Sequence, residues 1–339
     1  MKNKDRELLI KNNEKTSIKF GKDPLKRDLK ELFEKGFINI DKNHGVNSHQ
    51  LVDNLKEVLN IKKAGHSGTL DPNVTGVLLI GLGKATRLME YMLKSNKEYV
   101  CHMFIHKEVT KEEILKVFKK FTGKIKQLPP VISAVKREER IREIYSIKLL
   151  DYESKGKDIL FRVACQHGTY IRKLCSDIGK ELGIGAQMKE LRRTKAGPIK
   201  EEDEIISLDK LRNLFELYNN SKIKKEKEIF EKELKKYIKP MEFLLKDFKK
   251  VYVRDSAVDS ICHGGDLAIP GIAKLEENIE IGETIAMFTL KNELIGMGMA
   301  FLTSKDIIKK RKGAFIKTNK VFMEINTYPQ VWDFNKKEE

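Results

Sequence analysis

A single carboxylate stands at the centre of the stretch of this chain that is best suited to chemistry. Asp71 lies between a loop of small polar residues that begins at Gly65 and a run of four aliphatic residues at 77–80. The proline after Asp71 disfavours the α region for the residue before it, so the carboxylate is presented from a stiff, extended turn. Glycines at 65, 68 and 76 allow positive φ angles and a close approach of the backbone to a ligand. A plain Asp-Pro turn before a core strand would share these local features.

Two familiar catalytic motifs do not fit this stretch. A phosphate-binding loop of the type G-x-x-x-x-G-K-[ST] would need glycine in place of Leu78 and Ser or Thr in place of Ala85. A nucleophile elbow, G-x-S-x-G, would need glycine in place of Thr69. Neither nucleotide hydrolysis nor acyl transfer is therefore supported.

The elements that must position Asp71 follow from hydrophobic periodicity. Strands are predicted at 36–42, at 77–80, from Lys97 onward and at 161–165, and helices at 49–61, 86–93 and 203–218. A further amphipathic helix is predicted through Leu174, Ile178 and Leu182, which places Arg172 in its first turn. A cation is disfavoured there because the helix dipole is positive at that end, so a nearby carboxylate would relieve the conflict.

The residues from Gly65 to Arg87 resemble the motif around the catalytic aspartate of the TruB class of RNA pseudouridine synthases, G-H-x-G-T-L-D-P followed by G-V-L-x-x-x-x-G-x-A-T. Further matches to that family occur in the order it requires. They are the strand and loop at 37–48, Lys97-x-Tyr99, the Q-x-P-P-x-x-S-A-x-K segment at 127–136 with R-x-R-x-I-Y at 140–145, the turn at 168–172, L-R-R-x-x-x-G at 191–197, and a C-terminal piece at 250–332. Seven matches in order, spanning nearly the whole chain, exceed chance agreement.

The resemblance implies an α+β fold. The catalytic part would hold a mixed, mostly antiparallel central sheet with flanking helices. A small C-terminal β-pseudobarrel, the RNA-binding PUA domain, would follow it, and the short strand-like runs at 251–253, 279–281, 284–288 and 294–298 are typical of such a barrel.

The resemblance also implies roles for individual residues. Asp71 would be the catalytic carboxylate, Arg172 would form an ion pair with it, and Tyr99 would stack on the target base. Six residues are expected to bind substrate: His66, Lys42, Lys97, Tyr170, Leu191 and Arg193. His66 would contact the displaced nucleotide, Leu191 would close the base pocket, and Arg193 would face phosphate or the aspartate. The loop after Lys42 lacks the proline and threonine that family members usually have, although Gly45 and Ser48 fit.

The implied reaction breaks the carbon–nitrogen glycosidic bond of a uridine and joins the same sugar to a carbon of the base. Asp71 would act as nucleophile or electrostatic partner, by attack at the sugar or at the base. The target must leave its stack, at a cost of a few kcal/mol. No metal or cofactor is expected.

Composition agrees with an RNA partner. Lys plus Arg total 67 against 50 acids, a net charge of +17 that suits a polyanion, although a lysine-rich surface alone would also produce it. The four cysteines never form C-x-x-C, and His102 and His106 have no acid or cysteine at ligand spacing, so neither a disulfide framework nor a zinc site is indicated. The sequence predicts a cytoplasmic protein without a signal peptide or membrane span.

Four regions are predicted along the chain. Residues 1–33 form an arm that is either disordered or pinned on the PUA domain through the apolar cluster at 8–10. Residues 34–247 form the catalytic domain, with a Lys/Glu-rich insert at about 219–239 that reads as a solvated helix. Residues 248–330 form the PUA domain, and 331–339 a short tail.

Two classes of function are consistent with these features. The first is an enzyme that modifies the TΨC arm of tRNA, or rRNA under the direction of an H/ACA guide RNA with small accessory proteins, or both. The second is a non-catalytic, PUA-containing RNA scaffold of a ribonucleoprotein.

Overall fold

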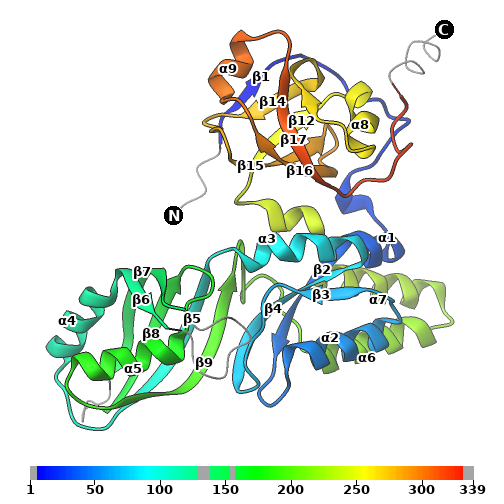
Figure 1. Ribbon diagram of the computed structural model, residues 1–339. Helices are drawn as coiled ribbons and strands as arrows, with labels where there is room; N and C mark the ends of the chain where they lie inside the picture. Colours follow the sequence, from blue (N-terminus) through cyan, green and yellow to red (C-terminus); the bar gives the residue numbers. More distant parts are fainter. Residues whose placement is uncertain (1–5, 129–137, 153–156, 331–339) are drawn as a thin grey trace, which may run out of the picture. The chain divides into compact units, whose positions relative to one another are not determined.

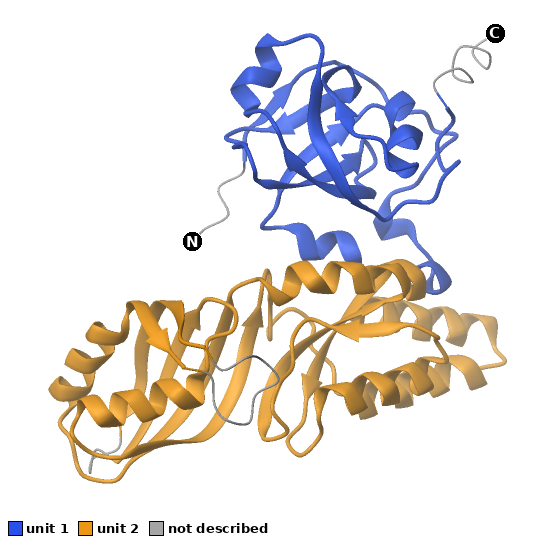
Figure 2. Ribbon diagram, in the orientation of Figure 1, with its two compact units in different colours: residues 1–31, 240–339 blue, residues 32–239 orange. Residues whose placement is uncertain are grey.

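The computed structural model describes residues 6–128, 138–152 and 157–330. The chain divides into two compact units, one of residues 32–239 and one that joins residues 1–31 to 240–339 (Figure 2). Most of the double-proline segment at 127–136, the end of the motif at 328–332 and the predicted tail at 331–339 lie outside the described residues.

The unit of residues 32–239 is built on a ten-stranded sheet in the order β11-β2-β4-β9-β5-β8-β7-β6, with β3 paired to β4 and β10 to β9. The pairing of β4 with β9 is parallel, whereas β2–β4, β9–β5, β5–β8, β8–β7 and β7–β6 are antiparallel. The predicted mixed, mostly antiparallel sheet is thus confirmed. The strands are β2 Gly36–Lys42, β3 Ala64–His66, β4 Val74–Leu82, β5 Lys97–Ile105, β6 Gly123–Gln127, β7 Arg140–Tyr152, β8 Asp158–Cys165, β9 Ala186–Ala196, β10 Ile199–Lys200 and β11 Ile238–Pro240.

Helices cover this sheet and bury its apolar residues. Figure 1 shows α4 and α5 side by side, and their apolar faces share one core with residues of β5 and β8. Leu70, Val74 and Leu191 belong to the same core, so the segment that carries Asp71 is anchored in it on both sides. The helices of this unit are α2 Ser48–Leu59, α3 Met89–Leu93, α4 Lys111–Phe121, α5 Ile171–Glu181, α6 Leu208–Asn220 and α7 Lys224–Tyr237, with a 3-10 turn at Gly83–Leu88 and α1 Leu29–Lys35 at the unit boundary.

The predicted start of the helix at 203–218 is wrong. Helix α6 begins at Leu208, where the side chain of Ser207 accepts a hydrogen bond from the backbone N–H of Lys210 at 3.3 Å. Ile206 instead lies beside strand β2, since its N–H donates to Asn39 O (3.1 Å) and its carbonyl accepts from Asp41 N (2.9 Å). Ile205 and Ile206, whose spacing from Leu208 and Leu211 imitates a helix, are therefore extended chain.

The other unit holds a seven-stranded sheet in the order β1-β14-β12-β15-β16-β17-β13 around its own apolar core. Strand β1, the apolar cluster near the N-terminus, pairs antiparallel with β14. The elements are β1 Leu8–Ile10, β12 Lys249–Val253, β13 Leu267–Ala268, β14 Ile272–Glu276, β15 Thr284–Thr289, β16 Leu294–Ala300, β17 Ala314–Val321, α8 Asp255–Cys262, α9 Ser304–Lys309 and 3-10 turns at Pro24–Lys26, Met241–Leu245 and Ile269–Gly271.

The strand predicted at 279–281 is wrong. Ile279 is buried in the core of this unit while Ile281 is 65% exposed, which imitates strand alternation. Asn278 just before the segment (φ 57°) has left-handed backbone, so the chain turns instead of pairing.

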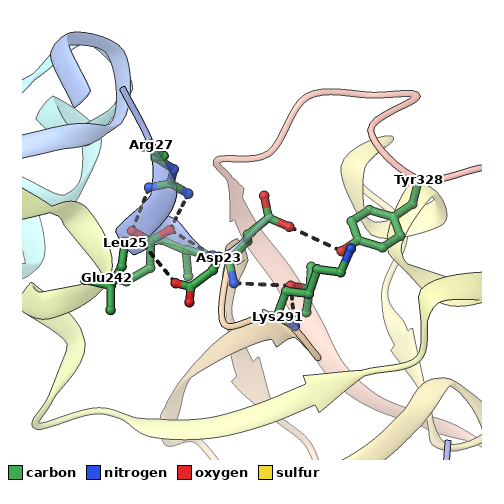
Figure 3. A network of polar contacts seen from close by, with 9 residues as sticks. Asp23, Leu25, Arg27, Glu242, Lys291 and Tyr328 are labelled. Carbon is green, nitrogen blue, oxygen red and sulfur yellow. Dashed lines mark hydrogen bonds and ion pairs between the residues drawn. The ribbon is translucent and has the colours of Figure 1, made fainter. Parts of the chain in front are cut away.

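A buried polar network holds the segment around Gly21 within its unit (Figure 3). Arg27 and Glu242 form a two-pronged ion pair with both N···O distances at 2.8 Å, and both side chains are buried. The hydroxyl of Tyr328 donates to Glu293 at 3.2 Å, and the amine of Lys291 donates to the carbonyls of Phe20 and Gly21. The contacts of Arg27 and Lys291 hold residues 20–27 against two separate segments, and the Phe20 ring packs against the ring of Tyr328 in a third.

Replacing Gly21 tests how tightly this network is packed. Gly21 has a φ of 60°, and an added Cβ would lie 2.2 Å from Glu293 Oε2 and 2.3 Å from the Tyr328 hydroxyl. We expect Gly21→Ala to lower the free energy of unfolding by about 2–5 kcal/mol, the sum of left-handed strain and overpacking. Gly282→Ala is the matched control, because Gly282 also has positive φ (82°) but nothing within 4 Å of the added Cβ. Denaturant unfolding that gives equal losses for the two variants would contradict the prediction.

Candidate active site

Lys42 fixes the loop that carries Asp71. It is the last residue of β2 and is fully buried, and its amine donates to three backbone carbonyls: Asn43 O (3.0 Å), Pro72 O (2.9 Å) and Val74 O (2.7 Å). A lysine ammonium has three donors, so all of them are used, two on the loop that carries Asp71 and one on the residue that follows Lys42. Burial lowers the pKa of Lys42, whereas the nearby Asp71 raises it.

Ser48 holds the same loop from the other side. This first residue of α2 donates its hydroxyl to Leu70 O (3.1 Å) and accepts from Leu70 N (2.9 Å). Val74 N donates back to Asp71 O at 3.0 Å, which closes the turn. The backbone on both sides of Asp71 is therefore hydrogen-bonded to two different elements, while its side chain stays accessible.

Asp71 forms an ion pair with Arg172, through Oδ2 and Nη2. Arg172 lies in the first turn of α5, as the sequence predicted, and the two side chains are 55% and 52% exposed. The guanidinium at the positive end of the helix thus has the carboxylate partner that its position calls for.

Arg193 and Tyr99 meet across neighbouring strands. They are opposite each other in the register of β9 and β5. Arg193 is only 2% exposed; its Nε donates to Val77 O (2.7 Å) and its Nη2 to Gly68 O (3.3 Å). Burial raises the pKa of Tyr99, and the Arg193 guanidinium opposes that rise. The guanidinium thus joins β9 to β4 and to the glycine turn before Asp71.

Arg192, the other arginine of the L-R-R motif, lies on the opposite face of β9 from Arg193. Successive side chains of a strand point to opposite faces, so Arg192 faces away from Arg193. Arg192 binds Asp41 through two hydrogen bonds (2.9 and 3.1 Å) and Glu201 through a third (2.8 Å). Leu191, which precedes both, is 9% exposed and lies opposite Val74 of β4 and Cys101 of β5.

His66 is held as a neutral imidazole. Its Nδ1 accepts a hydrogen bond from Gly68 N (3.2 Å), which leaves its proton on Nε2. Burial, then His49, then Arg193 lower the pKa of His66 to about 4. The His49 ring packs edge-on against it with the centroids 4.9 Å apart. The sequence prediction missed His49, for which the only signal was its place beside Ser48 at a helix start.

Lys97 and Tyr170 end the set of predicted residues. Lys97 is 6% exposed and donates to Met92 O (2.8 Å), Ser95 O (2.6 Å) and Ser95 Oγ (3.1 Å), so it closes the C-terminal end of α3. Burial lowers the pKa of Lys97 to about 7. Tyr170 is the N-cap residue that immediately precedes α5.

Family models match almost the entire chain. Residues 1–52 match the DKCLD (NUC011) domain and 56–171 the TruB family pseudouridylate synthase (N terminal domain). Residues 172–246 match the tRNA pseudouridylate synthase B C-terminal domain and 249–322 the PUA domain. A probable tRNA pseudouridine synthase B of Methanocaldococcus jannaschii is 46% identical over 334 residues, which cover 98% of this chain and 96% of that protein. The chain belongs to the TruB family of pseudouridine synthases.

Other TruB family proteins agree with this assignment. The probable tRNA pseudouridine synthase B of Methanopyrus kandleri is 44% identical over 97% of this chain and 94% of its own. Among solved structures, a chain of a Cbf5-Nop10-Gar1 complex is 44% identical with a TM-score of 0.89, covering 97% of both chains. A chain of an H/ACA RNP bound to a substrate RNA containing 2′-deoxyuridine is 42% identical with a TM-score of 0.87, covering 97% of this chain and 98% of that one. The resemblance found in the sequence and its fold class are confirmed.

Two further findings concern the described part of this TruB family chain. No group of three or more His, Cys, Asp or Glu side chains there is placed to hold a metal ion. Within the same residues, none of the helices is both long and apolar enough to cross a membrane.

The lowered pKa of His66 predicts a measurable dependence of stability on pH. In the unfolded chain His66 binds a proton near pH 6.5, whereas in the folded chain it does so only near pH 4. The unfolded state therefore holds more protons between these values, and the stability that neutral His66 contributes is lost as pH falls from 6.5 toward 4. We expect the stability of wild type relative to His66→Gln to fall between pH 7 and pH 5 in thermal unfolding.

Replacement of the exposed His44 by glutamine is the control for this experiment. It is expected to leave the pH profile of Tm unchanged. A His66→Gln profile that stays parallel to wild type across this range would refute the proposed burial of the neutral imidazole.

Proposed function

We propose that Asp71 is the carboxylate with which this pseudouridine synthase isomerises uridine in RNA. The observation that carries the proposal is the Asp71–Arg172 pair: an accessible carboxylate on a loop held from both sides, beside a guanidinium on a helix start. In the reaction the bond from the sugar C1′ to N1 breaks, C1′ bonds to C5, the C5 proton is released and N1 gains a proton. Asp71 supplies the anion for the step that separates base from sugar.

We assign the other predicted residues to two roles. Tyr99 stacks on the target base, Leu191 bounds it with an apolar wall, and neutral His66 contacts the displaced nucleotide as a donor through Nε2. Lys42, Lys97 and Arg193 were predicted to bind substrate, but their buried, hydrogen-bonded side chains support a positioning role. Tyr170 contributes through its place at the start of α5.

We propose tRNA, at the TΨC arm, and guide-directed rRNA as substrates. The relatives named tRNA pseudouridine synthase B support the first, and the similar chains solved as part of an H/ACA RNP support the second. The PUA domain and the net charge of +17 supply a phosphate-binding surface whose affinity falls with salt. Small accessory proteins of the kind found with Cbf5 are the proposed protein partners.

The domain limits proposed from the sequence are retained. They are an arm at 1–33, a catalytic domain at 34–247, a PUA domain at 248–330 and a tail at 331–339. The family matches at 172–246 and 249–322 support the limit between the catalytic and PUA domains. The compact units divide earlier, at residue 240, and join residues 1–31 to the C-terminal part. Helix α7, in the Lys/Glu-rich stretch, falls inside the family match at 172–246. A cytoplasmic location suits the RNA substrates and the four free, buried cysteines.

The substitution Asp71→Asn tests the assigned mechanism and separates an enzyme from an RNA scaffold. We expect RNA affinity within about twofold of wild type and a loss of at least about 10³-fold in pseudouridine formation, since the carboxylate charge is gone while the shape is kept. The assay uses the full chain on unmodified tRNA, and on an rRNA target with guide RNA and accessory proteins. Asp53→Asn, at an exposed aspartate of α2, is the control and should retain full activity. Unchanged product from Asp71→Asn would refute the mechanism.

Arg172 is tested by two substitutions of graded severity. Arg172→Lys keeps the charge but loses the planar fork, so we expect about a tenfold loss in kcat. Arg172→Ala leaves the carboxylate without its partner, and about 10²- to 10³-fold should be lost. Arg212→Ala, at an exposed arginine of α6, is the matched control. Wild-type turnover by Arg172→Ala would show that the ion pair has no part in the reaction.

A further inference from the structure

The side chain of Gln127 pairs with the backbone of a residue far away in the sequence. Gln127 ends strand β6 and is 2% exposed. Its Oε1 accepts from Tyr170 N at 3.0 Å, and its Nε2 donates to Tyr170 O at 3.2 Å. One carboxamide thus forms hydrogen bonds with both the backbone N–H and the backbone carbonyl of a single residue, as a neighbouring strand would.

Tyr170 determines where helix α5 begins. It is the capping residue of that helix, with φ −96° and ψ 104°, and its side chain makes no capping hydrogen bond. Its carbonyl accepts a helical hydrogen bond from Leu174 N at 3.0 Å. Arg172 follows two residues later, so any shift of the Tyr170 peptide moves the guanidinium as well.

The ion pair of Arg172 with Asp71 is too weak to hold this geometry alone. Both side chains are more than half exposed (52% and 55%). Ion pairs in such surroundings contribute little to stability, because water screens the charges and long side chains lose entropy. The position of the guanidinium must therefore come from the backbone that carries it.

We propose that Gln127 is a positioning residue for the pseudouridine synthase reaction: its two hydrogen bonds to Tyr170 fix the first turn of α5 and so hold Arg172 against Asp71. The inference rests on the proposed function of Asp71 and Arg172. It gives a role to a residue that touches neither the substrate nor the reacting atoms.

Glutamine has the chemistry that this position needs, and glutamate has it only when protonated. An ionised carboxylate would accept from Tyr170 N but would repel the Tyr170 carbonyl oxygen. A protonated carboxyl restores the arrangement, since its carbonyl accepts and its hydroxyl donates. Burial favours the neutral form of a carboxyl group, which brings this titration into an accessible pH range.

The test compares Gln127→Ala, Gln127→Glu and the control Gln187→Glu, an exposed residue of β9. Single-turnover rates and RNA dissociation constants are measured with the full chain, on the RNA that wild type modifies, between pH 5.5 and 8.5. We expect Gln127→Ala to lower the rate constant by about 10- to 100-fold with the dissociation constant within twofold, as misplaced catalytic groups do. Gln127→Glu should approach wild type at pH 5.5 and fall to the alanine level by pH 8.5, while the control follows wild type.

A double-mutant comparison shows whether Gln127 acts through Arg172. If it does, Gln127→Ala should cost much less in an Arg172→Lys background than in wild type. The proposal is overturned if Gln127→Ala lowers the rate constant by the same factor in both backgrounds, or if it keeps full activity. It is also overturned if Gln127→Glu loses activity independently of pH, or if only RNA binding is lost. Should the alanine variant fail to fold, the pH dependence of Gln127→Glu decides by itself. Failure of the proposed function would instead appear as wild-type protein without product, or as an active Asp71→Asn.

Discussion

The buried guanidinium of Arg193 is the contact on which the arrangement of the site most depends. From its place on β9 it is hydrogen-bonded to carbonyls of β4 and of the glycine turn. Removing one partner of a buried charge costs several kcal/mol, so these three segments are held as one body. Burial is the main cause of the lowered pKa of Lys42, His66 and Lys97, and the positive charge of Arg193 lowers each of these pKa values further.

Support and chemistry are divided between buried and accessible residues. The cations that brace the site are inside the fold and bind backbone carbonyls, whereas Asp71 and Arg172 project from the loop and the helix that these contacts fix. A catalytic group on a loop is positioned as precisely as one on a strand only when hydrogen bonds fix the backbone of the loop. Lys42 and Ser48 supply those ties for Asp71, and Gln127 supplies them for Arg172 in our proposal.

Local patterns predicted most of the catalytic unit. Strand β2 was predicted with its observed bounds, and the first turn of α5 with Arg172 in it, because apolar spacing and turn residues are local properties. The groups that long side chains contact could not be predicted from local patterns. Whether Lys42 or Arg193 reaches solvent or a backbone carbonyl depends on segments more than thirty residues away. The predicted start of α6 was wrong for the same reason, because Ile206 forms backbone hydrogen bonds with β2 instead.

The pairing of β1 with β14 has a consequence for how the protein is made. The unit that holds β1 consists of residues 1–31 and 240–339, so β1 leaves the ribosome without its partner strand, which follows only after more than two hundred further residues have been added. Residues 32–239 are complete before that point and can fold as a unit while the N-terminal segment waits. At about 5–20 residues per second, the wait lasts on the order of ten seconds or more. During that time Leu8–Ile10 is an unpaired apolar strand, and its shortness and charged neighbours protect it from joining the wrong sheet edge.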